Sequence, residues 1–222
     1  MAVIPTPRRQ ALAETAYDTI RRRLVDHDIE PGSKLNINTL AQELEISPTP
    51  LREALARLEA DGLVVKRSLA GYTAAALLSG RGLRELFEVR LLLEPAAASA
   101  AASRATPADL LQLADQLAEM RGAAGDFASR STLLLYLHHD AVFHDRIAGL
   151  SGNVFLRSTL ERLHAHTHQY RLSFREGWAE ETCREHERIL EAMGENDDET
   201  AAARMRTHLR RAQARLTEAA RQ

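Results

Sequence analysis

The sequence predicts a mainly α-helical protein of two domains: an N-terminal winged helix-turn-helix followed by an all-α antiparallel bundle of six helices. Ala, Leu, Arg and Glu dominate the 222 residues and aromatic residues make up only 5%, a composition that favours helices over sheets. In the first expected helix, apolar residues recur at steps of four. The exception is a β-like stretch at 63–73, where two short apolar segments flank a turn that contains glycine.

The N-terminal domain is predicted to span residues 1–76. Its first helix is expected at 11–28, and two shorter helices and the hairpin of 63–73 follow it. Four polar residues are candidate N-caps for the second and third helices: Asn38 or Thr39, and Ser47 or Thr49. Two short helices, a tight turn and a hairpin together indicate a winged helix-turn-helix.

The C-terminal domain is predicted to span residues 77–222. Turn-forming residues separate six helical segments, at 81–104, 107–121, 127–149, 154–173, 179–193 and 198–220. Pro95 lies inside the first segment, where it removes a backbone donor and crowds the carbonyl of Leu91, so we expect a kink or a break there. Short connections between helices favour an antiparallel bundle.

Several function classes are excluded by composition. No charge-free stretch reaches the roughly 20 residues that a membrane helix needs. Arg8, Arg9 and Glu14 stand where a secretory signal needs apolar residues, and Cys183 has no second cysteine to pair with. We therefore expect a cytoplasmic protein that has no contact with membranes.

The charge balance does not by itself indicate nucleic-acid binding. The formal net charge is −2, and residues 1–75 carry ten basic and ten acidic side chains. Because neither domain is basic overall, any prediction of DNA binding has to rest on motifs and on local basic surface.

The start of the third helix holds the candidate base-reading residues. A helix that enters the major groove needs donors near its N-terminus, where backbone N–H groups also attract phosphate. Arg52 can bind guanine O6 and N7 in bidentate fashion, and Ser47 and Thr49 are expected to hold phosphates. The alternatives are that Arg52 pairs with an acidic neighbour, Glu53 or Glu59, and that Ser47 only caps the helix.

The hairpin supplies a second candidate DNA contact. Lys66 and Arg67 are expected to meet phosphates, while Gly71 lets the backbone approach the minor groove. An ordinary solvated hairpin is the alternative.

Four residues of the C-terminal domain form a candidate metal site. Asp140 and His144 are four residues apart and therefore lie on one helix face, and His186 and His208 fall on two later helices. Three imidazoles and a carboxylate suit a divalent metal, with Zn placed first and Ni, Mn or Fe as alternatives. In the competing interpretation, these side chains satisfy one another in the core.

Arg90 interrupts an apolar stretch of the first bundle helix. A guanidinium at the edge of a metal cavity can clamp a carboxylate whose other oxygen completes the metal shell. We weigh this role equally against a buried ion pair with Glu94, four residues later.

The N-terminal motifs resemble the DNA-binding domain of GntR-family regulators over residues 11–75. The resemblance is carried by Ile29–Leu35, Leu40-Ala41, Ser47–Leu55 and Leu58–Leu63. It adds Lys34 to the expected DNA contacts. Many family members carry an Arg directly after the position of Ser47, whereas this chain has Pro48, so one common base contact is missing.

The bundle is similar to the FCD effector domain of FadR-type GntR regulators over residues 81–218. Three segments match the family's metal-ligand segments: Asp140–His144, Glu185–Leu190 and Met205–Leu209. The resemblance implies a homodimer that binds a palindromic DNA operator, and a small carboxylate effector bound at the metal. It also implies repression that the effector relieves.

Two alternatives remain open beside this regulator. In one, the metal of an FCD-type regulator is purely structural, or a bulky acyl ligand binds without metal. In the other, the protein is a metal-dependent hydrolase, which is disfavoured because Glu187, next to His186, points about 100° away from it on a helix. We therefore do not expect an enzyme.

Overall fold

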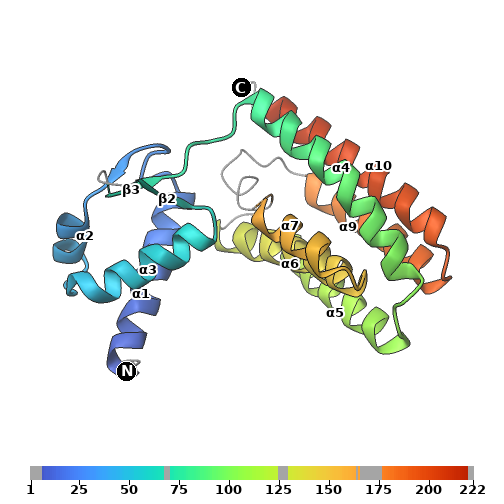
Figure 1. Ribbon diagram of the computed structural model, residues 1–222, viewed down its shortest axis with the longest axis horizontal. Helices are drawn as coiled ribbons and strands as arrows, with labels where there is room; N and C mark the ends of the chain where they lie inside the picture. The colour runs from blue at the N-terminus through green and yellow to red at the C-terminus, as the bar shows by residue number, and fades with distance from the viewer. Residues whose placement is uncertain (1–6, 68–70, 125–129, 164, 166–176, 220–222) are drawn as a thin grey trace. The chain divides into compact units, whose positions relative to one another are not determined.

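The computed structural model describes residues 7–67, 71–124, 130–163, 165 and 177–219 (Figure 1). The chain divides into two compact units, Met1–Leu77 and Leu78–Gln222. Among the described residues, no helix is both long enough and apolar enough to cross a membrane.

The N-terminal unit is a winged helix-turn-helix, as predicted. Its elements are α1 (Pro7–Val25), β1 (Lys34–Leu35), α2 (Ile37–Glu43), α3 (Pro48–Ala60), β2 (Val64–Arg67) and β3 (Gly71–Ala74). β3 is the central strand and pairs antiparallel with both others, so that Thr73 lies opposite Lys34 on one side and Val65 on the other. The sequence did not predict β1, because two residues are too short to show alternation.

The core of this unit is apolar. Leu51, Leu55 and Leu58 lie on one face of α3 and are buried against side chains such as Ile20 of α1 and Tyr72 of β3. Among the described residues of this unit, no charged side chain is buried. The charged groups are therefore left at the surface, where DNA could reach them.

α1 spans Pro7–Val25, whereas the sequence predicted residues 11–28, and one predicted N-cap also differs from the structure. Asn36 begins α2, instead of Asn38 or Thr39, because its side-chain oxygen accepts from both of those backbone N–H groups, at 2.9 and 3.2 Å. Ser47 is the N-cap of α3, but its side chain makes no capping hydrogen bond. The first position of α3 is Pro48, which has no N–H to satisfy.

The C-terminal unit is an all-helical bundle. Its described helices are α4 (Gly80–Ala102), α5 (Pro107–Ala124), α6 (Arg130–Leu150), α7 (Val154–Arg162), α9 (Trp178–Gly194) and α10 (Asp198–Ala219). The helix expected at 154–173 ends at Arg162, with Leu163 as its C-cap, and residues 164 and 166–176 lie outside the described residues. α4 continues through Pro95, so the break considered there does not occur.

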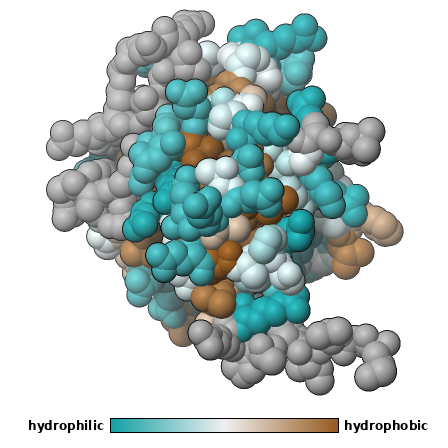
Figure 2. All heavy atoms as spheres, turned by 90° about the vertical axis from the view of Figure 1, so that its left-hand side faces the viewer, coloured by the Kyte–Doolittle hydropathy of each residue, from teal (hydrophilic) through white to brown (hydrophobic). Residues whose placement is uncertain are grey.

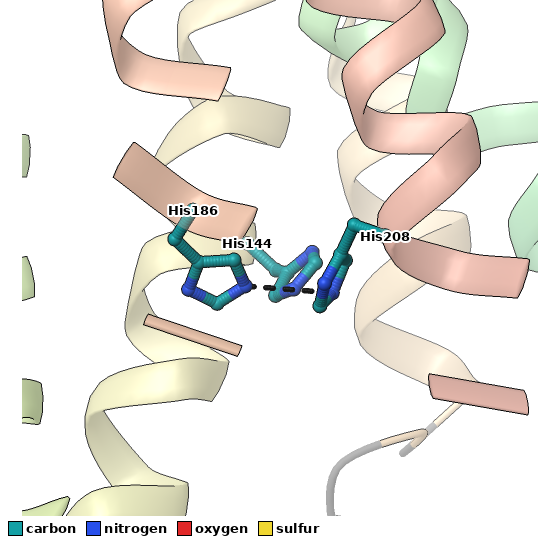
Figure 3. Close-up of side chains that lie close together, drawn as sticks. All are labelled: His144, His186 and His208. Carbon is teal, nitrogen blue, oxygen red and sulfur yellow. Dashed lines mark hydrogen bonds between the residues drawn. The ribbon is translucent and has the colours of Figure 1, made fainter. Parts of the chain in front are cut away.

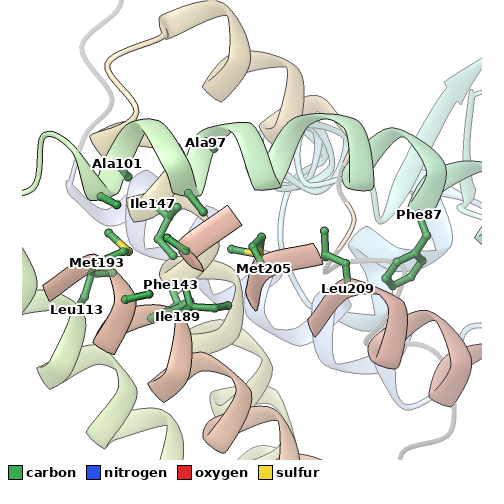
Figure 4. Packing of buried hydrophobic residues seen from close by; sticks show 14 of the residues in the cluster. Phe87, Ala97, Ala101, Leu113, Phe143, Ile147, Ile189, Met193, Met205 and Leu209 are labelled. Carbon is green, nitrogen blue, oxygen red and sulfur yellow. The ribbon is translucent and has the colours of Figure 1, made fainter. Parts of the chain in front are cut away.

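The packing of this bundle brings α4, α6, α9 and α10 together. α4 packs along α10, and α9 contacts both α5 and α10. Their inner faces share an apolar core that contains Phe87, Phe143, Ile189 and Leu209 (Figure 4). Buried ionisable side chains lie among the same four helices, and they form the site described next.

Candidate functional site

Three histidines from three helices converge inside the bundle. His144 of α6, His186 of α9 and His208 of α10 are all buried and turn their rings toward one another (Figure 3). One ring nitrogen from each lies within 4.8 Å of the others, and Nε2 of His186 is 3.4 Å from Nε2 of His208. Helix packing thus gathers residues that are 42 and 22 positions apart in the chain.

The donor set fits a divalent metal ion. Two ligand atoms on one ion lie about 3.0 to 3.4 Å apart when the bonds are about 2.1 Å long and the angles octahedral or tetrahedral. The Nε2–Nε2 distance of 3.4 Å between His186 and His208 agrees with this spacing. Asp140 adds a carboxylate, with Oδ1 3.5 Å from Nε2 of His186. The three predicted histidine ligands therefore form one group, and Asp140, the fourth predicted ligand, lies beside His186.

Electrostatics favour the protonation state that a metal needs at His144. Burial lowers the pKa of His144 to about 4, although the nearby Glu94 carboxylate opposes this shift. The imidazole is therefore neutral at pH 7, and a neutral ring has one nitrogen with a lone pair to donate.

Two buried carboxylates hold the outer nitrogens of His144 and His208. Oε2 of Glu94 accepts a hydrogen bond from Nδ1 of His144 at 2.5 Å, and Oε2 of Glu185 accepts one from Nδ1 of His208 at 2.8 Å. Such bonds orient the ring and keep Nε2 as the nitrogen available for an ion. The carboxylates are thus part of the site, on its outer side.

Sequence reasoning missed Glu185 and this role of Glu94. Burial by itself raises the pKa of Glu185, but hydrogen bonds from His208 and Arg215 outweigh it and bring the pKa to about 2. Burial likewise raises the pKa of Glu94, and the greater influence of Arg90 and His144 holds that pKa well below its usual range. Both carboxylates are therefore charged, although their helical positions show no pattern that distinguishes them from surface acids.

Arg90 is fully buried beside this cluster. Its Nε donates to Oε1 of Glu94 at 2.5 Å, which is the ion pair considered from the sequence. Nη1 and Nη2 of Arg90 are buried and have no hydrogen-bond partner among the described residues. One guanidinium thus forms the ion pair and still offers two donors.

A small cavity of about 30 Å³ adjoins the histidine cluster. Its lining includes Arg90, Asp140, Trp178, His208 and Arg215. Both Nη atoms of Arg215 donate hydrogen bonds to Glu185, and Nη2 also donates to Thr182. Of these two arginines, Arg90 is therefore the one whose Nη donors lack partners among the described residues.

The predicted DNA-contacting residues lie at the surface of the N-terminal unit. All seven are exposed: Lys34, Ser47, Thr49, Arg52, Lys66, Arg67 and Gly71. Hydrophilic side chains make up much of the face drawn in Figure 2, which includes this unit. Gly71 has a φ of +81°, which L side chains rarely adopt, so the backbone itself requires glycine at the start of β3.

The two acidic residues considered as alternative partners of Arg52, Glu53 and Glu59, do not pair with it. Glu53 forms an ion pair with Arg9. Within the part of the chain that the structure describes, no ion pair of Arg52 with Glu53 or Glu59 is formed.

In the bundle, Glu187 pairs with Arg121, and this pairing agrees with the expectation that Glu187 does not serve as a general base.

Comparisons with known proteins agree with both resemblances. Residues 12–73 match the family "Bacterial regulatory proteins, gntR family", and residues 85–211 match the FCD domain. The Nta operon transcriptional regulator of Aminobacter aminovorans is 35% identical over 63% of this chain and 63% of its own. The HTH-type transcriptional regulator LutR of Bacillus subtilis is 30% identical over 82% of this chain and 90% of its own.

A solved structure has the same fold. E. coli McbR/YncC superposes with a TM-score of 0.70 at 23% identity, over 93% of this chain and 97% of that one.

Proposed function

The chain belongs to the GntR family of bacterial transcription regulators and carries an FCD domain, and from this premise we propose that a small organic acid, bound at a metal centre in the bundle, controls its affinity for operator DNA. The protein acts as a homodimer, since a two-fold protein matches a palindromic operator. It acts in the cytoplasm, where bacterial DNA is found. Repression that the acid relieves is the mode we propose.

The proposed DNA contacts begin at α3. Arg52 reads a base edge, while Ser47, Thr49 and Lys34 bind phosphates. In the β2–β3 hairpin, Lys66 and Arg67 bind DNA phosphates, and Gly71 lets the protein backbone approach the minor groove. The support for these roles is exposure: all seven residues are free to reach DNA without unfolding the unit.

The proposed metal centre uses Asp140, His144, His186 and His208. Zn is our first choice, with Ni, Mn or Fe as alternatives, because imidazole and carboxylate donors suit all four. When bound, the ion would supply a positive centre that attracts an anionic ligand. The histidines hold it through neutral nitrogens, and the outer carboxylates keep those nitrogens in place.

The observation that carries the effector proposal is the guanidinium of Arg90. Leaving charged donors buried without a partner is costly, and a carboxylate in the adjoining cavity would satisfy Nη1 and Nη2 together. The same cavity reaches Asp140 and His208, so a carboxylate bound there would lie beside the metal. The cavity of about 30 Å³ is too small for a bulky acyl chain, which is why we propose a small carboxylate as the ligand.

The effector proposal is tested by a thermal-shift screen of small carboxylic acids, with and without chelator, on the full chain. Trp178 is the only tryptophan and lines the cavity, so its fluorescence gives a second readout. We expect an acid that shifts the melting temperature and weakens operator binding, and we expect chelator to abolish both effects. An acid response that survives chelation would make the metal purely structural.

The variant Arg90→Ala should reduce effector affinity without removing the metal, although the loss of a partner of Glu94 should weaken metal binding. Arg81→Ala is the matched control, because Arg81 lies on the same helix and its side chain is 82% exposed. If Arg90→Ala responds to the acid like wild type, Arg90 is only the partner of Glu94 and the effector proposal is wrong.

A further inference from the structure

Glu94 joins the two halves of the proposed effector site. Its Oε1 accepts from Nε of Arg90 and its Oε2 accepts from Nδ1 of His144, both at 2.5 Å. We propose that Glu94 is a positioning residue that couples the anion-binding guanidinium of Arg90 to the metal ligand His144. This inference rests on the proposed function, because it assigns to Glu94 the regulation of that same site.

The chemistry of a carboxylate explains why one residue can do this. Ionised Glu has two acceptor oxygens, and each of them serves one donor here. Gln has the same shape but a single acceptor oxygen, and its NH₂ group would face a donor on the other side. Because Glu94 is buried, water is poorly placed to replace whichever bond is lost. As long as Nδ1 of His144 carries the proton, which metal binding at Nε2 requires, Glu94→Gln can keep the bond to Arg90 or the bond to His144, but not both.

The two hydrogen bonds of Glu94 allow a movement of Arg90 to change the position of His144. A ligand that draws the guanidinium of Arg90 toward the cavity also moves the hydrogen bond that holds Glu94. A shift of Glu94 changes the orientation of the His144 ring, and with it the metal shell. Linkage requires the reverse as well, so metal occupancy alters the affinity of Arg90 for an anion by the same factor.

Glu185 provides an internal control within the same centre. It holds Nδ1 of His208 just as Glu94 holds Nδ1 of His144. Its guanidinium partner Arg215, however, uses both Nη atoms on Glu185 and Thr182. Glu185 therefore supports a metal ligand without a connection to Arg90.

Cobalt(II) is a suitable probe, because its visible spectrum reports the ligand set and its affinity can be measured by competition with a chelator. Glu94→Gln and Glu185→Gln should each lower Co²⁺ affinity about 10- to 100-fold. Arg90→Lys keeps the positive charge but loses the planar guanidinium with its fixed donors. A change in Co²⁺ affinity in this variant therefore reflects how Glu94 is positioned more than the net charge. We expect Arg90→Lys to lower Co²⁺ affinity and to alter the Co²⁺ spectrum.

The decisive measurement is a double-mutant cycle. Groups in direct contact show couplings equivalent to about 2- to 150-fold in affinity, so the effect of Arg90→Lys should disappear when Glu94 is replaced by Gln. In the Glu185→Gln background, the effect of Arg90→Lys should persist unchanged. Glu94→Asp keeps the charge and both oxygens, and it should recover part of the affinity that Glu94→Gln loses. Circular dichroism shows whether each variant is folded.

The outcomes separate this inference from the proposed function. Equal effects of Arg90→Lys in the wild-type and Glu94→Gln backgrounds would overturn the coupling, while the metal centre would stand. Wild-type Co²⁺ affinity in Glu94→Gln would also overturn it. A wild-type protein that takes up neither Co²⁺ nor Zn²⁺ would refute the metal centre, and the coupling with it. Should Glu94→Gln fail to fold, the cycle is run with Glu94→Asp, whose shorter side chain reaches the two partners less well. The effect of Arg90→Lys should then shrink, and an unchanged effect would overturn the coupling.

Discussion

The two units place their ionisable residues in opposite ways. In the N-terminal unit the predicted DNA contacts are exposed and the core is apolar. In the bundle, Arg90, Glu94, Glu185 and the three histidines are buried together. A surface that binds DNA uses charged side chains that are exposed to water, whereas the proposed small-ligand site uses charged side chains that are buried.

This difference determines how each unit responds to mutation. A surface charge can be removed with little effect on folding, because both states solvate it. A buried charge is stable only while its partners remain, and loss of one partner leaves the other uncompensated. Five predictions test this contrast, the last two on one contact, and they run from the largest expected effect to the smallest.

Metal removal should destabilise the bundle most. An ion present at about 1,000 times its Kd stabilises the folded state by about 4 kcal/mol, and a chelator removes that contribution. Calorimetry with and without chelator should show a large downward shift for the bundle and none for the N-terminal unit. The double variant His144→Ala/His208→Ala is the control, and its melting should be insensitive to chelator. Unchanged metal content in this variant would refute the assignment of the ligands.

Arg90→Met should lower the free energy of unfolding far more than Arg52→Met, the matched substitution at the surface. Arg90→Met leaves Glu94 buried without its cation, so the free energy of unfolding should fall by about 3 kcal/mol or more. Arg52→Met at the surface should change it by less than about 0.5 kcal/mol. Urea titration of both variants measures the contrast, and equal losses would show that exposure does not separate the two units.

Arg52 should determine operator discrimination without affecting stability. Arg52→Ala should cost about 1 to 3 kcal/mol on a specific site, because a bidentate guanine contact is lost. Lys66→Ala is the comparison, and it should weaken binding to all sequences alike and reduce the salt dependence. Fluorescence anisotropy on operator and on random DNA distinguishes them. Equal losses on both DNAs would assign Arg52 to phosphate.

The smallest effect is expected at a polar contact inside the N-terminal unit. The Tyr17 hydroxyl donates to Oδ2 of Asp61, the C-cap of α3, at 2.6 Å. Tyr17→Phe should therefore cost about 1 kcal/mol in urea titrations at pH 7.

The same contact predicts a pH dependence. Burial, together with the hydrogen bond to Asp61, raises the pKa of Tyr17 from 10.0 to about 12. Because the folded state holds this proton more tightly, the contribution is complete below pH 10 and is lost as the pH rises through about 12. The difference in stability between wild type and Tyr17→Phe should shrink over that window, and parallel curves would contradict this assignment.

Local signals explain which parts of the fold were predictable. Periodic apolar residues identified α1 and α3, and two short apolar segments around a turn with glycine located the hairpin. The strand β1 was missed because a two-residue strand is defined by its partner, Thr73 and Tyr72 of β3, and not by its own pattern. The N-cap Asn36 was missed because Asn38 and Thr39 are also good capping residues. Pro95 did not break α4, a helix whose face is packed along α10.

The sequence by itself determined the residue types and spacings of the site. Asp140 and His144 share one helix face because four residues complete about one turn, and the family motifs pointed to His186 and His208. Only the tertiary structure decided that Glu94 serves both Arg90 and His144, and that Glu185 holds His208. It also decided that Arg90 lines a cavity while its two Nη donors lack partners among the described residues. The physical reason is distance along the chain: helical periodicity specifies neighbours within a turn, whereas contacts across 50 or 23 residues depend on how whole helices pack.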